Sequence, residues 1–156
     1  MIKDSGSRRE FESGAVRDVA EGKGRCDLLP LGVISHRLGN KVFAFIEEYI
    51  RYGDIASLWF ALDHFIGTDD KQWCSMLLEV AKQYEAGAKK YDERNWEKGI
   101  PLHCYIDSAV RHYLKWKRGD TDEPHDRAFV WNILGAIWTH QNKPEMIDLP
   151  FMDSSR

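Results

Sequence analysis

Apolar residues recur every three to four positions along most of this chain, which is the spacing of one face of an α-helix. The clearest run extends from Trp73 to Tyr91, where charged side chains occupy the opposite face. Asp69 or Asp70 stands just before this run, and either side chain can cap a helix N-terminus. The pattern therefore predicts a long amphipathic helix in the middle of the chain.

Two shorter runs precede the long helix. Helical spacing of apolar residues predicts a helix that starts with a cap at Ser35 and ends at Gly53. Asp54 can cap the next helix, whose apolar residues continue as far as Gly67. We therefore expect one helix before Gly53 and a second one directly after it.

Two further helices are predicted after Pro101, at about 102–117 and 122–140. The turn between them is short, so the two helices should lie antiparallel and in contact. Pro124 is compatible with a helix start, because the first turn has no intrahelical amide bond to lose. No segment alternates between apolar and polar residues as a strand would. The predicted fold is all-α, a single compact helical domain of about five main helices.

The two ends of the chain are more polar than its centre. Residues 1–14 contain little to bury and are predicted to form a mobile tail, whereas residues 143–156 should form an irregular tail. The 156 residues, 43% of them hydrophobic, suit one domain with a substantial core. We therefore expect that domain to span residues 15–142.

Charge and cysteine content narrow the class of protein. A net charge of −3 gives no general attraction to nucleic acid or to an anionic membrane, which argues against DNA binding. The three cysteines are far apart and contain no CxxC pair, as expected for free thiols in a reducing compartment. No run approaches the roughly 18 apolar residues of a membrane span, and the charged N-terminus is unlike a signal peptide. These features favour a cytoplasmic protein.

The candidate chemistry lies between Gly87 and Asn132, where polar residues stand inside apolar runs. On the last predicted helix, His125 and Asn132 share one face because they are seven residues apart. Asn132 would be a buried amide, since this helix is apolar almost all round. A buried asparagine can bind a ligand or simply a neighbouring backbone group, and the sequence leaves both interpretations open.

Acidic residues near the last turn suggest a metal site. Asp107 and Arg111 are four residues apart on one helix, and Glu123 and Asp126 are three residues apart near the start of the next. Because the two helices should be neighbours, the three carboxylates could bind Mg²⁺ or Mn²⁺. A surface ion pair and two acids that complement a helix dipole would produce the same spacing.

Cations and aromatic residues are interleaved where the long helix ends. The residues concerned are Lys89, Lys90, Tyr91, Arg94, Asn95, Trp96 and Lys98. Positive charge for phosphate and flat rings for a base are what a nucleotide pocket requires. A solvated basic helix end has a similar composition, but it would not need Asn95 and Trp96.

Five segments also resemble one known family, in the family's order: GAVRD, EGKGRCDLLP, GAKKYDERNWEKGIP, DSAVRHYLKW and DEPHDRAFVWN. Together they span roughly residues 12–140 and resemble the phage and prophage family of dATP/dGTP diphosphohydrolases, N-terminal domain. The resemblance implies that a purine deoxynucleoside triphosphate is cleaved to the monophosphate and pyrophosphate with a divalent metal. It also implies a role in phage nucleotide metabolism, in the cytoplasm of the bacterial host. Residues 36–71 resemble the family least and look like a helical insertion.

The MazG-like group, a related superfamily of all-α nucleotide pyrophosphohydrolases, holds its metals with Glu-Glu-x-x-Glu on one helix and Glu-x-x-Asp on the next. Glu123-Pro-His-Asp126 is similar to the second motif. The first motif is absent at the expected place, where the helix offers only Asp107. The Glu47-Glu48 pair is followed at the right distance by Arg51 instead of an acid.

The leading hypothesis is a metal-dependent diphosphohydrolase that uses these residues. Four cations would neutralise the phosphates: Lys23, Arg25, Lys90 and Arg111. Tyr91, Asn95 and Trp96 would contact the base or sugar, and Asn132 would also bind the substrate. Three carboxylates would hold the metal: Asp107, Glu123 and Asp126. His112 or His125 would transfer a proton or bind phosphate.

Three other hypotheses stay open. The second is a non-catalytic nucleotide-binding or regulatory module, as a possible homo-oligomer, that uses the same residues without hydrolysis. The third is an HD-type phosphohydrolase, suggested by His112 and the His125-Asp126 pair, with Asp148 as a distal acid. The fourth is a structural role in which the six tryptophans serve a helical interface.

Overall fold

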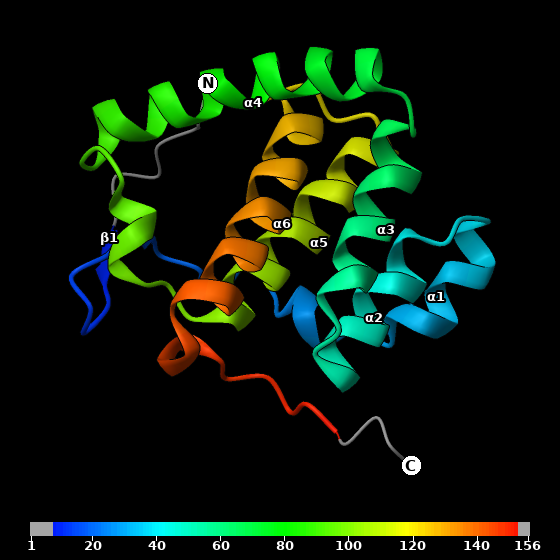
Figure 1. Ribbon diagram of the computed structural model, residues 1–156, viewed down its shortest axis with the longest axis horizontal. Coiled ribbons are helices and arrows are strands. Elements are labelled where there is room, and N and C mark those ends of the chain that lie inside the picture. The colour runs from blue at the N-terminus through cyan, green and yellow to red at the C-terminus, as the bar shows by residue number, and fades with distance from the viewer. Residues whose placement is uncertain (1–7, 153–156) are drawn as a thin grey trace.

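The computed structural model describes residues 8–152 and confirms the all-α fold class (Figure 1). Within that range the chain forms six α-helices: α1 (Leu31–Leu38), α2 (Val42–Tyr52), α3 (Ile55–Ile66), α4 (Asp70–Lys90), α5 (Leu102–Arg118) and α6 (His125–Asn142). The same range has three short 3-10 helices: η1 (Cys26–Leu28) before α1, η2 (Asn95–Lys98) between α4 and α5, and η3 (Pro144–Met146) after α6. None of the helices within residues 8–152 is long and apolar enough to cross a membrane.

Helices α5 and α6 form an antiparallel pair at the centre of the molecule. Figure 1 shows α4 lying across one end of this pair, α1 to α3 on one side, and the N-terminal strands with η2 on the other. The α5–α6 contact buries Tyr105, Ile106, Phe129 and Ile133, each at most 1% exposed. Burial of large apolar side chains of this kind is the main source of the fold's stability.

Helices α5 and α6 pack tightly at Gly135. A Cβ atom at Gly135 would come within 2.4 Å of Cε1 of Tyr105, so no larger residue fits without movement of that ring. The Tyr105 ring is itself fixed, because it is only 1% exposed. The spacing of the central pair therefore depends on this one missing side chain.

The prediction of one helix from Ser35 to Gly53 is wrong in its first half. The chain forms two helices there, because Gly39 adopts a left-handed conformation (φ 69°) and ends α1. Ser35 lies inside α1, where its hydroxyl donates to the Gly32 carbonyl oxygen over 2.8 Å and caps nothing. The chain therefore has six α-helices within residues 8–152 instead of about five.

The predicted caps of α3 and α4 are confirmed. The Asp54 carboxylate accepts a hydrogen bond from the Ala56 amide at the start of α3. The Asp69 carboxylate accepts from the Gln72 amide, and the Gln72 side chain completes a capping box. Helix α6 begins at His125, so Glu123 and Pro124 belong to the loop before it and not to its first turn.

A two-stranded sheet near the N-terminus was not predicted. Strand β1 (Arg8–Glu10) pairs antiparallel with β2 (Val16–Asp18), with Arg9 opposite Arg17. The Asn95 side chain of η2 holds the sheet, since its amide oxygen accepts from the Val16 N–H and its amide nitrogen donates to the Val16 carbonyl, both over 2.9 Å. Residues 1–7 of the predicted tail lie outside the described residues.

The segment after α6 returns along the body of the protein. The Asp148 carboxylate accepts from the backbone N–H of His103 over 2.9 Å and also contacts the His103 ring. The Phe151 ring packs against Tyr49, with ring centroids 5.3 Å apart. These contacts place residues 143–152 against α2 and α5, although the segment is irregular apart from η3.

Candidate functional site

A cleft of about 130 Å³ opens where the N-terminal sheet, α4, η2 and the α5–α6 end of the helical core meet. Seven of the residues that the sequence singled out line it: Lys23, Tyr91, Asn95, Trp96, Arg111, His112 and Glu123. The structure thus brings together side chains from three regions that are far apart in the sequence. Six further candidates do not line this cleft: Arg25, Lys90, Asp107, His125, Asp126 and Asn132.

The cleft carries an excess of positive charge. Five cations line it, and they are Arg9, Arg17, Lys23, Arg111 and Lys115. The lining contains only two carboxylates, those of Asp18 and Glu123. Asp18 is already paired with Lys90 at 2.9 Å, so it offsets little of the remaining charge. An anion would therefore be attracted to this cleft.

Arg17 is the most strongly positioned of these cations, and the sequence analysis did not single it out. Its Nη2 donates to the Asn132 amide oxygen over 2.9 Å and to the Ser108 hydroxyl over 3.1 Å. Its guanidinium also lies against two rings, 5.3 Å from the centroid of Tyr105 and 5.7 Å from that of Trp131. Asn132 is fully buried and holds Arg17 from behind, which gives this predicted site residue a positioning role.

Three arginines of the cleft have buried N–H groups that lack a partner. Within the described part of the chain, Nε of Arg9, Nη1 of Arg17 and Nε of Arg111 are buried without a hydrogen bond. Leaving such donors unpaired is costly, because each has lost its water. The oxygens of a phosphate group would supply the missing acceptors, since guanidinium groups pair closely with phosphate.

Asp107 is occupied by protein contacts. Both of its carboxylate oxygens accept from Arg111 over 2.8 Å, and one also accepts from the Cys26 backbone N–H over 2.7 Å. Arg111 Nη2 in turn donates to the Gly24 carbonyl over 2.6 Å. Asp107 therefore orients Arg111 and anchors the glycine-containing loop beside Lys23, and it stands apart from the groups that could share a metal ion.

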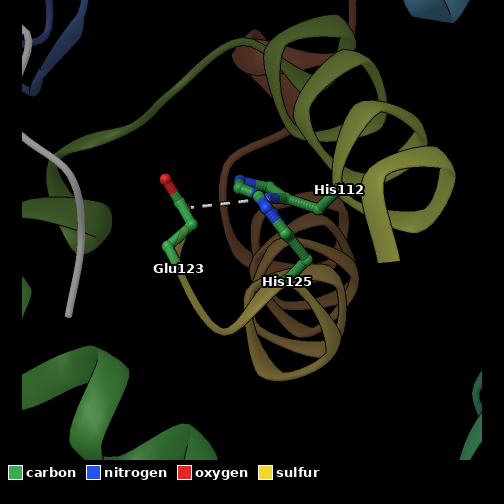
Figure 2. A group of neighbouring side chains, drawn as sticks. All are labelled: His112, Glu123 and His125. Atoms are coloured by element: carbon green, nitrogen blue, oxygen red, sulfur yellow. Dashed lines mark hydrogen bonds and ion pairs between the residues drawn. The ribbon is translucent and has the colours of Figure 1, made fainter. Parts of the chain in front are cut away.

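Two histidines and a carboxylate converge next to the cleft, as Figure 2 shows for His112, Glu123 and His125. They come from α5, from the loop before α6 and from the first residue of α6. The Nδ1 atoms of His112 and His125 are 2.9 Å apart, and the Glu123 carboxylate is 3.8 Å from His112 Nδ1. Burial, and next the neighbouring charge of His125, lower the pKa of His112 to about 3. His112 is therefore neutral near pH 7 and has a lone pair to offer.

The hydrogen bonds around His125 define how this cluster can react. Asp122 contacts His125 Nε2 over 2.7 Å, and a carboxylate can only accept, so Nε2 carries a proton. In a neutral ring Nδ1 then has the lone pair, and it faces His112 Nδ1. Either one proton lies between the two Nδ1 atoms or both lone pairs bind one cation.

The donor chemistry suits a transition metal better than Mg²⁺. Two imidazoles and one carboxylate form a mixed nitrogen and oxygen donor set that suits divalent transition metals, whereas Mg²⁺ prefers oxygen ligands and water. Asp120 and Asp122 form a second group with the same His125. Among the residues described, Asp107 and Asp126 belong to neither group, so the predicted set of three carboxylates does not converge.

The remaining predicted residues do not line the cleft and make contacts elsewhere in the protein. Lys90 is largely buried and binds Asp18, while Arg25 pairs with Asp27 at 2.8 Å and its side chain is 55% exposed. The carboxylate of Asp126 accepts from the Arg127 backbone N–H over 2.8 Å.

Tyr91 and Asn95 combine lining the cleft with structural contacts. The Tyr91 hydroxyl donates to Asp18 over 3.1 Å, and burial, followed by the charge of Asp18, raises the pKa of this hydroxyl to about 12. Both polar atoms of the Asn95 side chain are engaged with Val16. Tyr91 therefore stays protonated, and Asn95 has little capacity left for a ligand.

The fold and the cleft together define an all-α protein in which a cleft lined by cations lies beside aromatic rings. The chain belongs to the family described as dATP/dGTP diphosphohydrolase, N-terminal, whose model matches residues 70–149. This match confirms the resemblance seen in the sequence, and the family's name is that of a hydrolase acting on purine deoxynucleotides. The matched range contains the whole histidine cluster but leaves out Arg9, Arg17 and Lys23. No curated protein and no solved structure matches the chain.

Proposed function

We propose that the cleft binds a purine deoxynucleoside triphosphate and hydrolyses it to the monophosphate and pyrophosphate with a divalent cation. The observation that carries this proposal is the set of buried, unpaired guanidinium N–H groups of Arg9, Arg17 and Arg111 around a cationic cleft. A triphosphate supplies several negative oxygens, which would satisfy these donors together. The family's name supports the purine deoxynucleotide as the substrate class.

The cations have distinct tasks in the proposed reaction. Arg17 and Arg111 are fixed by Asn132 and Asp107, so each can bind a phosphate oxygen without losing much conformational freedom. Lys23 belongs to an exposed loop and can close over the ligand. Charge that develops on the leaving pyrophosphate would be stabilised by groups that are already in place.

The histidine cluster would hold the divalent cation. When bound there, a cation would supply positive charge to the reacting phosphate oxygens. His112 and His125 would offer their Nδ1 lone pairs, and Asp122 would keep His125 in the required tautomer. The Glu123 carboxylate, which lines the cleft, would accept the proton of the attacking water.

A binding module without catalysis is the second candidate, and one observation favours it. The cluster beside the cleft has a single carboxylate, because Asp107 is engaged by Arg111 and Cys26. A site with few carboxylates neutralises less of a metal's charge and could bind nucleotide without cleaving it. In that case the same arginines would bind the triphosphate, and the product would never form.

The test is product analysis after incubation with dATP or dGTP and either Mn²⁺ or Mg²⁺. Ion-exchange chromatography should show monophosphate and pyrophosphate, with faster turnover in Mn²⁺. His112→Gln should reduce turnover at least tenfold, whereas the exposed His36→Gln, in α1, is the matched control and should not. Intact triphosphate in all wild-type reactions, together with measurable binding, would replace the hydrolase by the binding module.

A further inference from the structure

A second and larger pocket, of about 500 Å³, opens beside the cationic cleft. The two share walls, because Tyr91, Asn95, Trp96 and Trp131 line both of them. One side of the second pocket is a face of α4 that includes Tyr84, Glu85, Gly87 and Ala88. A ligand could therefore place a charged part in the cleft and another part in this pocket.

Four aromatic side chains line the second pocket, and three of them pack against one another. The Tyr84 ring meets Trp96 and Trp131 edge to face, with ring centroids 5.8 and 6.0 Å apart. Trp96 is also held by Trp138, whose ring centroid lies 4.9 Å away. Rings that are held in this way offer a flat ligand a fixed stacking surface, with little conformational entropy to lose on binding.

Small residues on α4 leave room opposite these rings. Gly87 lies in the last turn of α4, where its carbonyl oxygen accepts from the Tyr91 N–H, and it lines the pocket together with Ala88. A glycine and an alanine at these positions add little side-chain bulk to the pocket, which leaves room for a planar ligand.

Two carboxylates at the edge of the pocket have no partner in the described structure. Glu85 and Glu93 line the pocket and are exposed, and within residues 8–152 neither makes a hydrogen bond or an ion pair. An ionised carboxylate only accepts hydrogen bonds. The Watson–Crick edge of guanine presents two adjacent donors, N1–H and the N2 amino group, whereas adenine presents one donor beside an acceptor. A carboxylate in this position therefore favours guanine.

We propose that this pocket is the nucleobase subsite, in which the aromatic walls stack a purine and Glu85 and Glu93 favour guanine over adenine. The inference rests on the proposed function, since it places the triphosphate of the same nucleotide in the cationic cleft. The triphosphate would be bound by the cations of the cleft, and the base by the aromatic residues and carboxylates of the second pocket. Substitutions in the pocket should therefore act on base recognition and leave phosphate binding intact.

The experiment compares the affinities of dGTP, dATP and inorganic tripolyphosphate by isothermal titration calorimetry in the absence of metal. Gly87→Leu fills the pocket and should weaken dGTP binding at least tenfold while tripolyphosphate binding stays within twofold. Ala86→Leu adds the same side chain one position earlier on α4, outside the pocket lining, and should bind dGTP like the wild type. Retained tripolyphosphate binding also shows that each variant is folded.

The base preference is tested with the double variant Glu85→Gln and Glu93→Gln. The wild type should bind dGTP more tightly than dATP, and the double variant should bind the two about equally. Glu48→Gln, at an exposed position of α2, is the control. Unchanged dGTP affinity in Gly87→Leu would overturn the pocket assignment even if hydrolysis is intact. A wild type that binds dGTP in the pocket but never cleaves it would overturn the hydrolase alone.

Discussion

Arg17→Met is the most direct test of the phosphate site, because it removes a guanidinium and keeps a long side chain. In the free protein Nη1 of Arg17 is buried and unpaired, while Nη2 is held by Asn132 and Ser108. The methionine side chain can still lie between Tyr105 and Trp131, since a thioether packs well against aromatic rings. The fold should lose some stability, because the buried Asn132 amide oxygen loses its donor, but in the folded variant the main loss of ligand affinity should be one charge-assisted hydrogen bond.

The size of the effect follows from the number of bonds that are lost. A hydrogen bond to a charged group contributes about 1.5–3 kcal/mol. At about 1.4 kcal/mol for each factor of ten, the dissociation constant should rise roughly 10- to 140-fold. Because the lost contact is to phosphate, the same factor should apply to dGTP, dATP and inorganic tripolyphosphate.

Isothermal titration without metal measures the three affinities while hydrolysis is prevented. Arg51→Met is the control, because Arg51 lies on α2 with its side chain 53% exposed and forms only a long ion pair with Glu47. Its dissociation constants should match those of the wild type. If Arg17→Met is folded and binds tripolyphosphate within twofold of the wild type, the assignment of this cleft to phosphate is wrong.

Two further predictions concern the helical core and the C-terminal segment. Gly135→Ala should lower the free energy of unfolding by about 1–3 kcal/mol, because its Cβ would overlap the buried Tyr105 ring; an unchanged melting temperature would contradict this packing. Hydrogen bonds with Cys104 and then with Asp148 raise the pKa of His103 to about 9. A raised pKa stabilises the fold below the unfolded value near 6.5 and ceases to do so as the pH rises through 9. Asp148→Asn should therefore lower the pKa of His103, which NMR can follow. The variant should be less stable than the wild type at pH 6.5, and this difference should shrink as the pH rises to about 9.5. If the pKa of His103 is the same in the variant and the wild type, the contact with Asp148 is wrong.

Much of the helical architecture could be predicted because its signals are local. The caps at Asp54 and Asp69 and the apolar spacing of α4 depend on residues within a few positions of each other. The break between α1 and α2 was missed because the local pattern of apolar residues does not mark it. The apolar run after Gly39 continues the helical spacing, and only the backbone shows that this glycine ends α1.

The parts of the site that escaped prediction depend on contacts between distant segments. Strand β2 is three residues long and shows no alternation, so Arg17 carried no signal of its pairing with Asn132, which lies 115 positions away. The spacing of Asp107 and Arg111 was recognised, but spacing alone does not show that Arg111 and Cys26 occupy both carboxylate oxygens. Charge pattern suggested a phosphate site, and tertiary packing decides which cations form it.

The two hydrogen bonds between Asn95 and Val16 bear on the order in which the protein folds. A side chain here takes the place of a neighbouring strand, because it pairs with the N–H and the carbonyl of one residue as a strand would. An isolated two-stranded hairpin is only marginally stable in water. The hairpin is therefore synthesised early but becomes stable only after η2 has emerged and packed. The arginines it carries would reach their places late in folding, once the helices they contact have formed.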